Sequence, residues 1–467
     1  MIKNDISQFK TLNAYTRILI VFILINPIID VITSIGIREY NITLSIGILL
    51  KGLFLIYTVI AFLRTSSTSK IDKIAKYILF AFIIYAAVHS LLSLQSFGFS
   101  RTVSGGITMV KTFYLPLVIL SLYKLIDKKD ITLLTRALVY SAAFVASIIA
   151  LSMLTGTDYN AYKYGKTGTV GWFFAANEVS ALLGILTPIL IYFILEKLKA
   201  NPVVKIMIIS AYTFLYYQIG TKVVALSVIM TVFYVIVLFI LRKVKDRKLY
   251  ILKPVVTLSV LFIVSMGLVP VTPIGINLNL HNRLIIDRYE DNIDEENPES
   301  DEDIKNDFGI EEILDNEEVL MSLVFSGRDE YFTIRKFIYD RASTTEKLFG
   351  LTQFAVTNNN QIKSYIIEID YFDIFFNFGI IGSIFYWVIV LGSLGYAVRN
   401  AFRNWRIFEP SSILPYYLCS VILAFGIAMF AGHVFVSPSV SFYLALIISI
   451  LTVESNNKNN KKRLSLT

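Results

Sequence analysis

Cysteine, histidine and charge are all scarce in this 467-residue chain. The only thiol, Cys419, lies in an apolar run, which excludes a disulfide framework and a cluster of thiolate metal ligands. His89, His281 and His433 are far apart in sequence, so they do not predict a multi-histidine metal site. The chain also lacks an internal repeat and a glycine-rich phosphate loop. Charged residues make up only 17% of it, against roughly 25% in soluble domains.

Apolar residues, in contrast, make up 55% of the chain, and the mean hydropathy is +0.64. A soluble core cannot hide that much apolar surface, so the sequence predicts an all-α polytopic membrane protein. A helix needs about 20 mostly apolar residues to cross a bilayer, and about twelve such runs are present. They are 17–35, 42–63, 75–96, 106–124, 131–154, 174–196, 203–219, 222–241, 251–272, 373–397, 412–431 and 438–453.

Lysine and arginine residues indicate how these spans are oriented, because cytoplasmic segments carry an excess of them. With the N-terminus inside, the inner segments hold 27 basic residues and the short outer loops hold five. This bias predicts an even number of spans, both termini in the cytoplasm, and one large extracytoplasmic segment between the ninth and tenth spans. The predicted organisation is nine spans in 1–272, the outer segment 273–372, three spans in 373–453 and a basic cytoplasmic tail in 454–467.

The outer segment 273–372 divides into two parts. Residues 287–318 contain 16 Asp or Glu against two basic residues, which predicts a mobile, solvated loop. A calcium loop is the alternative, but Lys305 stands where an oxygen ligand belongs and the glycine of an EF-hand is missing. Residues 326–350 carry apolar side chains at helical spacing, which predicts an amphipathic helix on the outer membrane face.

Charge is strongly segregated along the chain. The outer segment holds 22 acidic and nine basic residues, a net charge of −13, whereas the whole chain is +8. The basic surplus therefore lies mostly in the predicted cytoplasmic segments. There it suits membrane topology and anionic lipids rather than nucleic acid.

Three carboxylates, Glu368, Asp370 and Asp373, stand just before or inside the apolar run that starts near residue 373. Carboxylates at the mouth of an apolar helix are unfavourable unless they are solvated, paired or used. One of the two aspartates suits an N-terminal helix cap, which is the structural alternative to a functional role. A carboxylate beside arginines on the outer face would also suit a general base for an acceptor hydroxyl.

Cationic side chains at the predicted outer face are candidates for binding a diphosphate. Lys222 lies between two apolar runs, so it either snorkels to the interface or offsets charge on a phosphate leaving group. Arg328 can grip phosphate with two hydrogen bonds, although an arginine in a loop is commonly a surface charge. Arg335 would share a helical stripe with Arg328. Further candidates are Arg341, Arg283 and Arg288. Asn177 is also a candidate; it opens a membrane helix together with Glu178, and helix capping and hydrogen bonding within the bundle are the alternative for this pair.

Four stretches, in this order, resemble the O-antigen polymerase and O-antigen ligase family of bacterial envelope glycosyltransferases. They are GWFFAANEVSALLGILTPILIY with Asn177, IGTKVVALSVI with Thr221 and Lys222, SGRDEYFTIRKFIYDRASTTEKLFG with Arg328 and Gly350, and EIDYFDIFFNFGIIG. The last resembles a histidine-led motif that ends in Gly-x-x-Gly. With the register set on Gly379 and Gly382, the family's histidine falls on Glu368 and its aromatic residue on Tyr371.

The resemblance implies a polymerase of repeat units for a capsule, exopolysaccharide or O-antigen, acting on the outer face of a bacterial plasma membrane. Donor and acceptor would both be oligosaccharides linked to undecaprenyl diphosphate. No cofactor or metal would be needed, because the lipid diphosphate is the leaving group. Glu368 would be the general base, with Asp370 as a helper, Asp373 as a helix cap and Tyr371 among the substrate-binding residues. A chain-length regulator and a flippase are candidate partners.

Other functions compete with this interpretation. A glycan ligase of the same family is one, although glutamate at position 368 departs from the ligase pattern. A lipid-linked oligosaccharide flippase should carry charges at mid-membrane and have related halves. Lys51 is the clearest such charge, Asp30 and Lys111 lie nearer the outer ends of their spans, and no two halves look alike. A structural role in an envelope complex is the remaining alternative.

Overall fold

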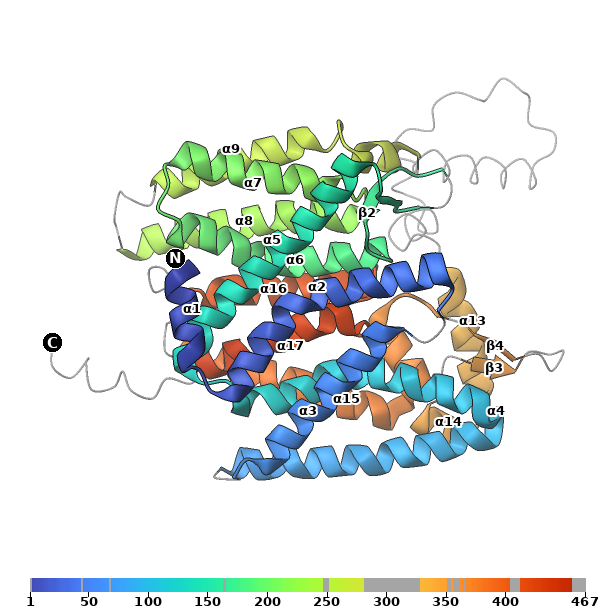
Figure 1. Ribbon diagram of the computed structural model, residues 1–467. Helices are drawn as coiled ribbons and strands as arrows, with labels where there is room; N and C mark the ends of the chain where they lie inside the picture. Colours follow the sequence, from blue (N-terminus) through green and yellow to red (C-terminus); the bar gives the residue numbers. More distant parts are fainter. Residues whose placement is uncertain are drawn as a thin grey trace, which may run out of the picture.

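The computed structural model describes residues 2–42, 45–66, 69–162, 165–246, 252–280, 328–350, 354–356, 362–364, 366–403 and 412–455, and these ranges are mainly helical (Figure 1). The helices are α1 (Ile2–Thr11), α2 (Ala14–Tyr40), α3 (Ile46–Arg64), α4 (Lys70–Leu125), α5 (Ile131–Thr155), α6 (Ala176–Tyr192), α7 (Pro202–Tyr217), α8 (Lys222–Asp246), α9 (Leu252–Leu268), α13 (Arg328–Arg341), α14 (Thr344–Phe349), α15 (Asp370–Arg403), α16 (Leu414–Phe430) and α17 (Pro438–Ser455).

Each predicted apolar run overlaps a described helix. Within the described ranges, eight helices are long and apolar enough to cross a membrane, or nine if the bent pair Val256–Leu268 and Pro273–Leu280 is one span. The shorter apolar helices α7 and α16 coincide with two more of the runs. The prediction of a helical, polytopic membrane protein is therefore confirmed, while the number of twelve spans stays a prediction.

Helix α4 covers two predicted runs because it folds back on itself at Gly98. This residue has φ +77° inside the helix, a conformation that glycine adopts without a steric penalty. In a straight helix Phe82 and Phe113 would lie about 46 Å apart, at 1.5 Å per residue. Their ring centroids are 4.6 Å apart. The two halves therefore run side by side in opposite directions (Figure 1).

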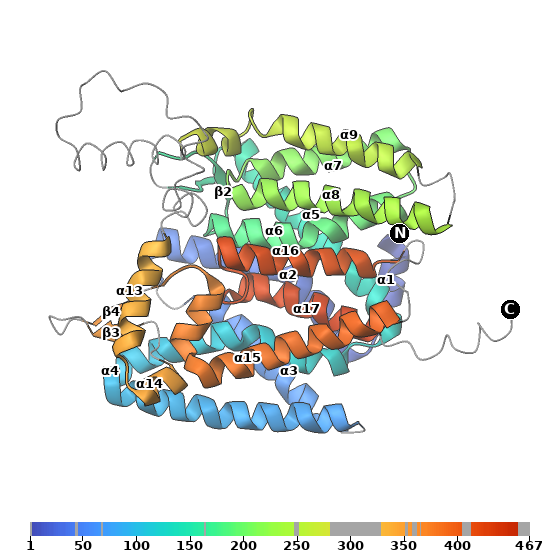
Figure 2. The ribbon, with the colours of Figure 1, turned by 180° about the vertical axis from the view of Figure 1, so that it is seen from behind.

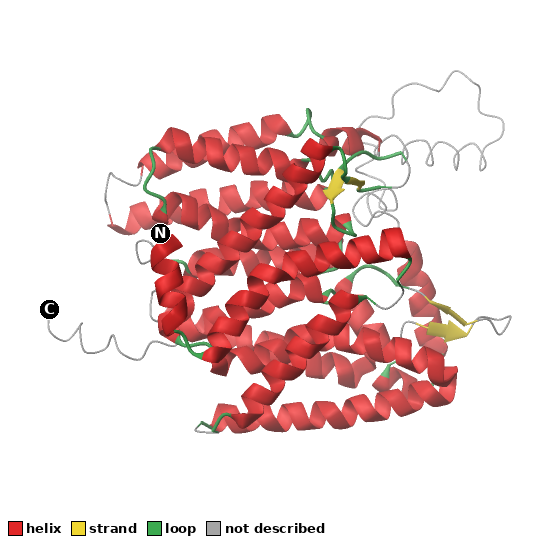
Figure 3. Cartoon of the chain, viewed as in Figure 1, coloured by secondary structure: helices red, strands yellow, loops and turns green. Residues whose placement is uncertain are grey.

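Short strands and helices gather at one end of the bundle, which we call the hairpin end (Figure 3). Here β1 (Tyr159–Asn160) pairs antiparallel with β2 (Thr169–Gly171), and β3 (Phe354–Val356) pairs antiparallel with β4 (Ile362–Ser364). Helices α13 and α14 lie at the same end, and α1 lies at the opposite end (Figures 1 and 2). Neither hairpin was predicted, so the all-α description holds for the bundle and not for this end.

The predicted outer segment differs in detail from the expectation. Residues 326–350 were predicted as one amphipathic helix, but α13 and α14 are separate, because Ser343 and Glu346 form a capping box that starts α14. A helix at Pro273–Leu280 follows α9 after a bend of 54°, beyond the predicted end of the ninth span. The acidic part 287–318, Arg283, Arg288 and residues 456–467 lie outside the described residues.

Helix α14 packs against a kink of α15, where the two backbones approach closely. The kink is at Gly379, which has φ +65°. A Cβ atom at Gly379 would lie 2.5 Å from the Gly350 nitrogen, so the two backbones meet where no side chain fits. On the other side, Tyr85 Oη donates to the Phe349 carbonyl oxygen over 3.2 Å, and His89 Nδ1 contacts the same oxygen at 2.7 Å.

Candidate functional site

The candidate site lies at the hairpin end, where the start of α13 meets the segment before α15. Arg328 Nη2 donates to Glu368 Oε2 over 3.0 Å, and Arg328 Nη1 donates to the Phe430 carbonyl oxygen over 3.4 Å. The Glu368 side chain is 45% exposed and that of Arg328 is 15% exposed. The structure thus brings the predicted arginine and the predicted carboxylate together and leaves the carboxylate accessible to a substrate.

His433 is a third member of this group, and the sequence reasoning did not select it. Its Nε2 lies 3.9 Å from Glu368 Oε1, in the 431–437 loop that joins α16 to α17. Glu368 and His433 both have φ +62°. Left-handed backbone is uncommon for residues other than glycine and concentrates at functional sites. The available signal was the polar Gly-His pair that interrupts two apolar runs at the predicted outer face.

Asp370 holds the 431–437 loop in place. Its buried carboxylate accepts the backbone N–H groups of His433 and Val434, both at 2.8 Å, and that of Phe435 at 2.6 Å. Hydrogen bonds to a charged acceptor are about twice as strong as neutral ones. The contacts therefore position the loop, and with it His433, against Glu368. The predicted role of Asp370 as a catalytic helper stays a prediction.

Asp373 fixes the segment that carries Glu368. Its carboxylate accepts the backbone N–H groups of Ile367 and Glu368, each over 3.0 Å. These donors precede α15, so Asp373 binds the segment before the helix rather than capping the N–H groups of its first turn. It thereby helps to hold Glu368 in its left-handed conformation.

Arg335 is buried between α13 and α15. It is 1% exposed, and its Nη2 donates to Asn377 Oδ1 over 2.9 Å. Burial lowers the pKa of Arg335 to about 10, and the nearby Asp373 carboxylate opposes that shift. Arg328 and Arg335 thus both contact the first part of α15 or the segment before it. Arg335, however, is placed to join the two helices rather than to meet a substrate.

Two lysines add positive charge beside Arg328. Lys222 is the first residue of α8, and Lys166 lies between β1 and β2. Burial lowers the pKa of Lys166, and the positive charge of Arg328 lowers it further. Lys166 and Arg328 are also the charges that act on Lys222. The three cations outnumber the exposed carboxylate of Glu368, because Asp370 and Asp373 are buried and already accept backbone N–H groups. The region therefore suits an anionic ligand. Lys166 was counted only as an outer-loop charge from the sequence.

Asn177 occupies the first turn of α6 but does not cap it. The N-cap position is Ala175, which makes no side-chain cap bond, so the capping alternative for Asn177 is wrong. The neighbouring Glu178 is the residue with a partner, because Ser437 Oγ donates to its Oε1 over 2.8 Å. The hydrogen bonding within the bundle that was the other alternative for this pair is thus made by Glu178.

Two further predicted residues, Tyr371 and Arg341, contact aromatic rings. Tyr371 stacks on Trp387 with ring centroids 5.2 Å apart, and its hydroxyl donates to the Phe425 carbonyl oxygen over 3.1 Å. The guanidinium carbon of Arg341 lies 3.5 Å from the ring centroid of Phe337, on its own helix. Arg283 lies outside the described residues.

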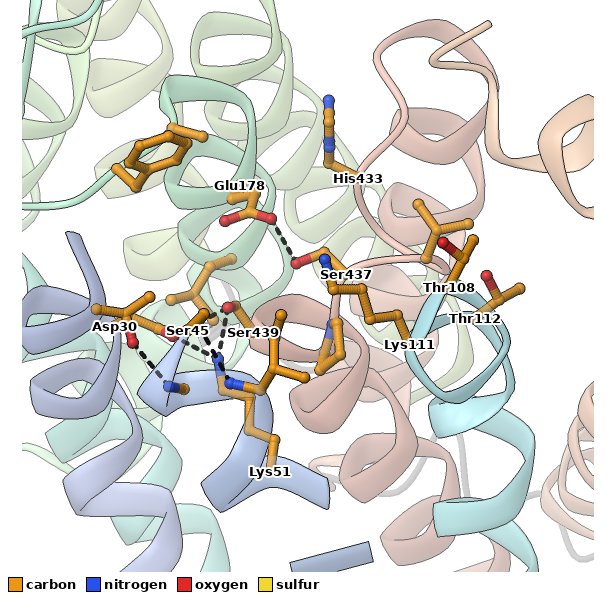
Figure 4. Close-up of a pocket in the computed structure, with 18 of the residues that line it drawn as sticks. Asp30, Ser45, Lys51, Thr108, Lys111, Thr112, Glu178, His433, Ser437 and Ser439 are labelled. Carbon is orange, nitrogen blue, oxygen red and sulfur yellow. Dashed lines mark hydrogen bonds and ion pairs between the residues drawn. The ribbon is translucent and has the colours of Figure 1, made fainter. Parts of the chain in front are cut away.

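A cavity of about 360 Å³ opens next to this group, among α2, α3, α4, α6, α15, α17 and the 431–437 loop (Figure 4). Within it, Lys51 forms an ion pair with Asp30 and donates to Ser439 Oγ over 2.6 Å. Ser439 Oγ in turn donates to Asp30 over 3.0 Å. Lys111 and Glu178 also line the cavity. Charges that looked isolated in sequence are therefore gathered in one place.

The cavity is continuous with the first group of residues. His433 and Asp373 line it, and His433 is the residue that faces Glu368. Within the described ranges no group of three His, Cys, Asp or Glu side chains is placed to hold a metal ion. The arrangement therefore places the half-exposed Glu368 carboxylate between Arg328, which it binds, and His433, which lines the polar cavity.

Comparisons with known proteins bear on what this arrangement does. A family model described as O-antigen ligase like membrane protein matches residues 12–458. Searches among curated proteins and among solved structures found no match.

Proposed function

The chain belongs to the O-antigen ligase-like membrane protein family, whose members act on lipid-linked glycans in the membrane, and from this premise we propose that it polymerises polysaccharide repeat units. The donor is a growing glycan on undecaprenyl diphosphate, and the acceptor is a second lipid-linked repeat unit. The product is a capsule, an exopolysaccharide or an O-antigen. In this proposal the chain crosses a bacterial plasma membrane twelve times, both termini are cytoplasmic, and the hairpin end faces outward.

The proposed reaction is a single glycosyl transfer. An acceptor hydroxyl oxygen forms a bond to the anomeric carbon of the donor sugar. The bond from that carbon to the diphosphate oxygen breaks, and its electron pair leaves with the lipid diphosphate. The hydroxyl proton passes to the Glu368 carboxylate, which acts as general base and later releases the proton to water. Nothing is oxidised or reduced, so the step needs no further reactant.

The observation that carries the proposal is the Arg328–Glu368 pair beside Lys166 and Lys222. The leaving group gains negative charge in the transition state, and preorganised cations nearby stabilise that charge. Arginine and lysine side chains suit a diphosphate, whose oxygens accept several hydrogen bonds. The exposed half of Glu368 remains available to an acceptor hydroxyl. One group of residues thus supplies both the anion site and the base.

Deleting the gene and examining the lipid-linked glycans tests the proposal against its alternatives. Loss of a polymerase leaves single repeat units on lipid or at the surface. Loss of a ligase leaves long chains still attached to lipid, and loss of a flippase leaves no repeat units outside. Either of the last two patterns would overturn the polymerase assignment, and re-expression of the intact gene is the control.

A further inference from the structure

Lys111 points to a ligand in the cavity. Its side chain extends from α4 toward Ser437 (Figure 4), and within the described ranges it makes no hydrogen bond and no ion pair. Lys51, the other lysine of the cavity, is already bound to Asp30 and Ser439. An ammonium group inside a membrane span is costly unless it is paired or meets a polar ligand.

The charges of the cavity select against a diphosphate. Lys51 and Asp30 neutralise each other, and Glu178 is the carboxylate that acts on Lys111. With Asp373 included, three carboxylates and two lysines line the cavity, whereas Arg328, Lys166 and Lys222 lie beside one exposed carboxylate, Glu368. An anionic lipid headgroup would bind beside Arg328, Lys166 and Lys222 rather than in the cavity. What suits the cavity is an uncharged molecule with many hydroxyl groups.

Sugar hydroxyls match the groups that line the cavity. A hydroxyl can donate to the Glu178 carboxylate and accept from the Lys111 ammonium, and Thr108 and Thr112 add hydroxyl groups on the same wall. Phe173 and Phe174 supply an apolar part of the lining, which a sugar ring can contact with its C–H face. A volume of about 360 Å³ lies at the lower end of small-molecule sites, roughly 300–1,000 Å³. It suits a short sugar segment rather than a lipid chain.

We propose that this cavity is the acceptor subsite of the transferase, where Lys111 and Glu178 hold the terminal sugar of the acceptor glycan. The assignment rests on the proposed function. Its geometric reason is that His433 both lines the cavity and lies 3.9 Å from Glu368. A sugar in the cavity therefore presents a hydroxyl to the Glu368 carboxylate, while the diphosphate of the donor lies on the side of Lys222.

The first test separates the two substrates kinetically. The full chain is reconstituted in lipid nanodiscs with the lipid-linked repeat unit from the deletion strain as donor. The acceptor is a repeat-unit alkyl glycoside, which lacks a diphosphate leaving group and so cannot act as donor. Lys111→Met and Glu178→Gln should each raise the KM for the glycoside about 10- to 100-fold, because each loses a hydrogen bond to a charged group. The KM for the donor should change less than about threefold.

The control is Lys205→Met, which removes a lysine that binds the Leu195 carbonyl oxygen and does not line the cavity. It should leave both KM values unchanged. An unchanged glycoside KM in the two cavity variants, or a rise confined to the donor KM, would overturn the assignment. If the wild-type protein forms no product at all, the proposed function itself fails.

A second test needs neither turnover nor a loss of charge. Cys419 is the only cysteine, so Thr108→Cys in a Cys419→Ala background places a single thiol in the cavity. The alkyl glycoside should slow the reaction of this thiol with a small methanethiosulfonate reagent at least about fivefold. Undecaprenyl diphosphate without sugar should not slow it. Equal labelling with and without glycoside, or protection by the diphosphate lipid alone, would refute the subsite.

Discussion

Replacing Asp370 with asparagine should release the 431–437 loop. Its carboxylate accepts three backbone N–H groups, with Oδ1 bound to His433 and Oδ2 bound to Val434 and Phe435. Asparagine keeps only one acceptor oxygen. If the amide oxygen replaces Oδ2, the N–H of His433 faces the NH2 group. If it replaces Oδ1, the N–H groups of Val434 and Phe435 face the NH2 group instead.

The size of the effect follows from these bonds. Each unmade buried hydrogen bond costs about 1–3 kcal/mol, and each bond that remains loses about 1 kcal/mol because its acceptor is no longer charged. In the better orientation, which keeps the bonds from Val434 and Phe435, the loop should therefore lose about 3–5 kcal/mol of local stability. Since 1.36 kcal/mol is tenfold, the amides of His433, Val434 and Phe435 should exchange with solvent at least about 100-fold faster.

Hydrogen exchange with mass spectrometry on the purified protein measures this directly. Asp340→Asn is the matched control, because Asp340 is exposed on α13. It should leave exchange in the loop unchanged. Transfer activity should fall in Asp370→Asn together with loop protection, since His433 is carried by the same loop. Exchange within about threefold of wild type would refute the anchoring role of Asp370.

Three further outcomes are expected. Gly379→Ala should lower the free energy of unfolding by about 2–4 kcal/mol, because φ is +65° and the new Cβ would meet backbone atoms. The control is Gly395→Ala, where a Cβ meets open space, and it should not lower the thermal unfolding midpoint. Because burial and Arg328 lower the pKa of Lys166, that lysine loses its proton at a lower pH than an ordinary lysine. Binding of undecaprenyl diphosphate should therefore weaken as pH rises, and Lys166→Arg should flatten the decline in a titration of Kd against pH. Arg328→Ala should reduce transfer at least about 100-fold at unchanged protein level, whereas Arg341→Ala should retain it.

The bundle was predictable from sequence because the bilayer imposes a length and a hydropathy on every span. The reversal of α4 is an example, since two apolar runs flank Gly98 and the polar residues near it. The hairpins and the break between α13 and α14 were not predictable in this way. Their strands are two or three residues long, and the break depends on one capping box at Ser343.

The site was predictable only in part. Arg328 and Glu368 each stand in a recognisable stretch, and they lie 40 positions apart in a direct contact. Lys166 has no such context and His433 has only a short polar pair between two apolar runs, because their importance depends on which loops the bundle brings together. The same holds for Lys111 and Glu178. They come from spans that sequence spacing cannot align, so their shared cavity emerges only from the packing.

The most direct test of the central claim is transfer by purified Glu368→Gln protein, compared with wild type on the lipid-linked repeat unit. Wild type should produce glycans of two or more repeat units, resolved by electrophoresis or mass spectrometry. Glu368→Gln keeps the shape and the exposure of the side chain but removes the base, so it should leave single repeat units while the protein remains folded. Chains of normal length made by Glu368→Gln would contradict the account.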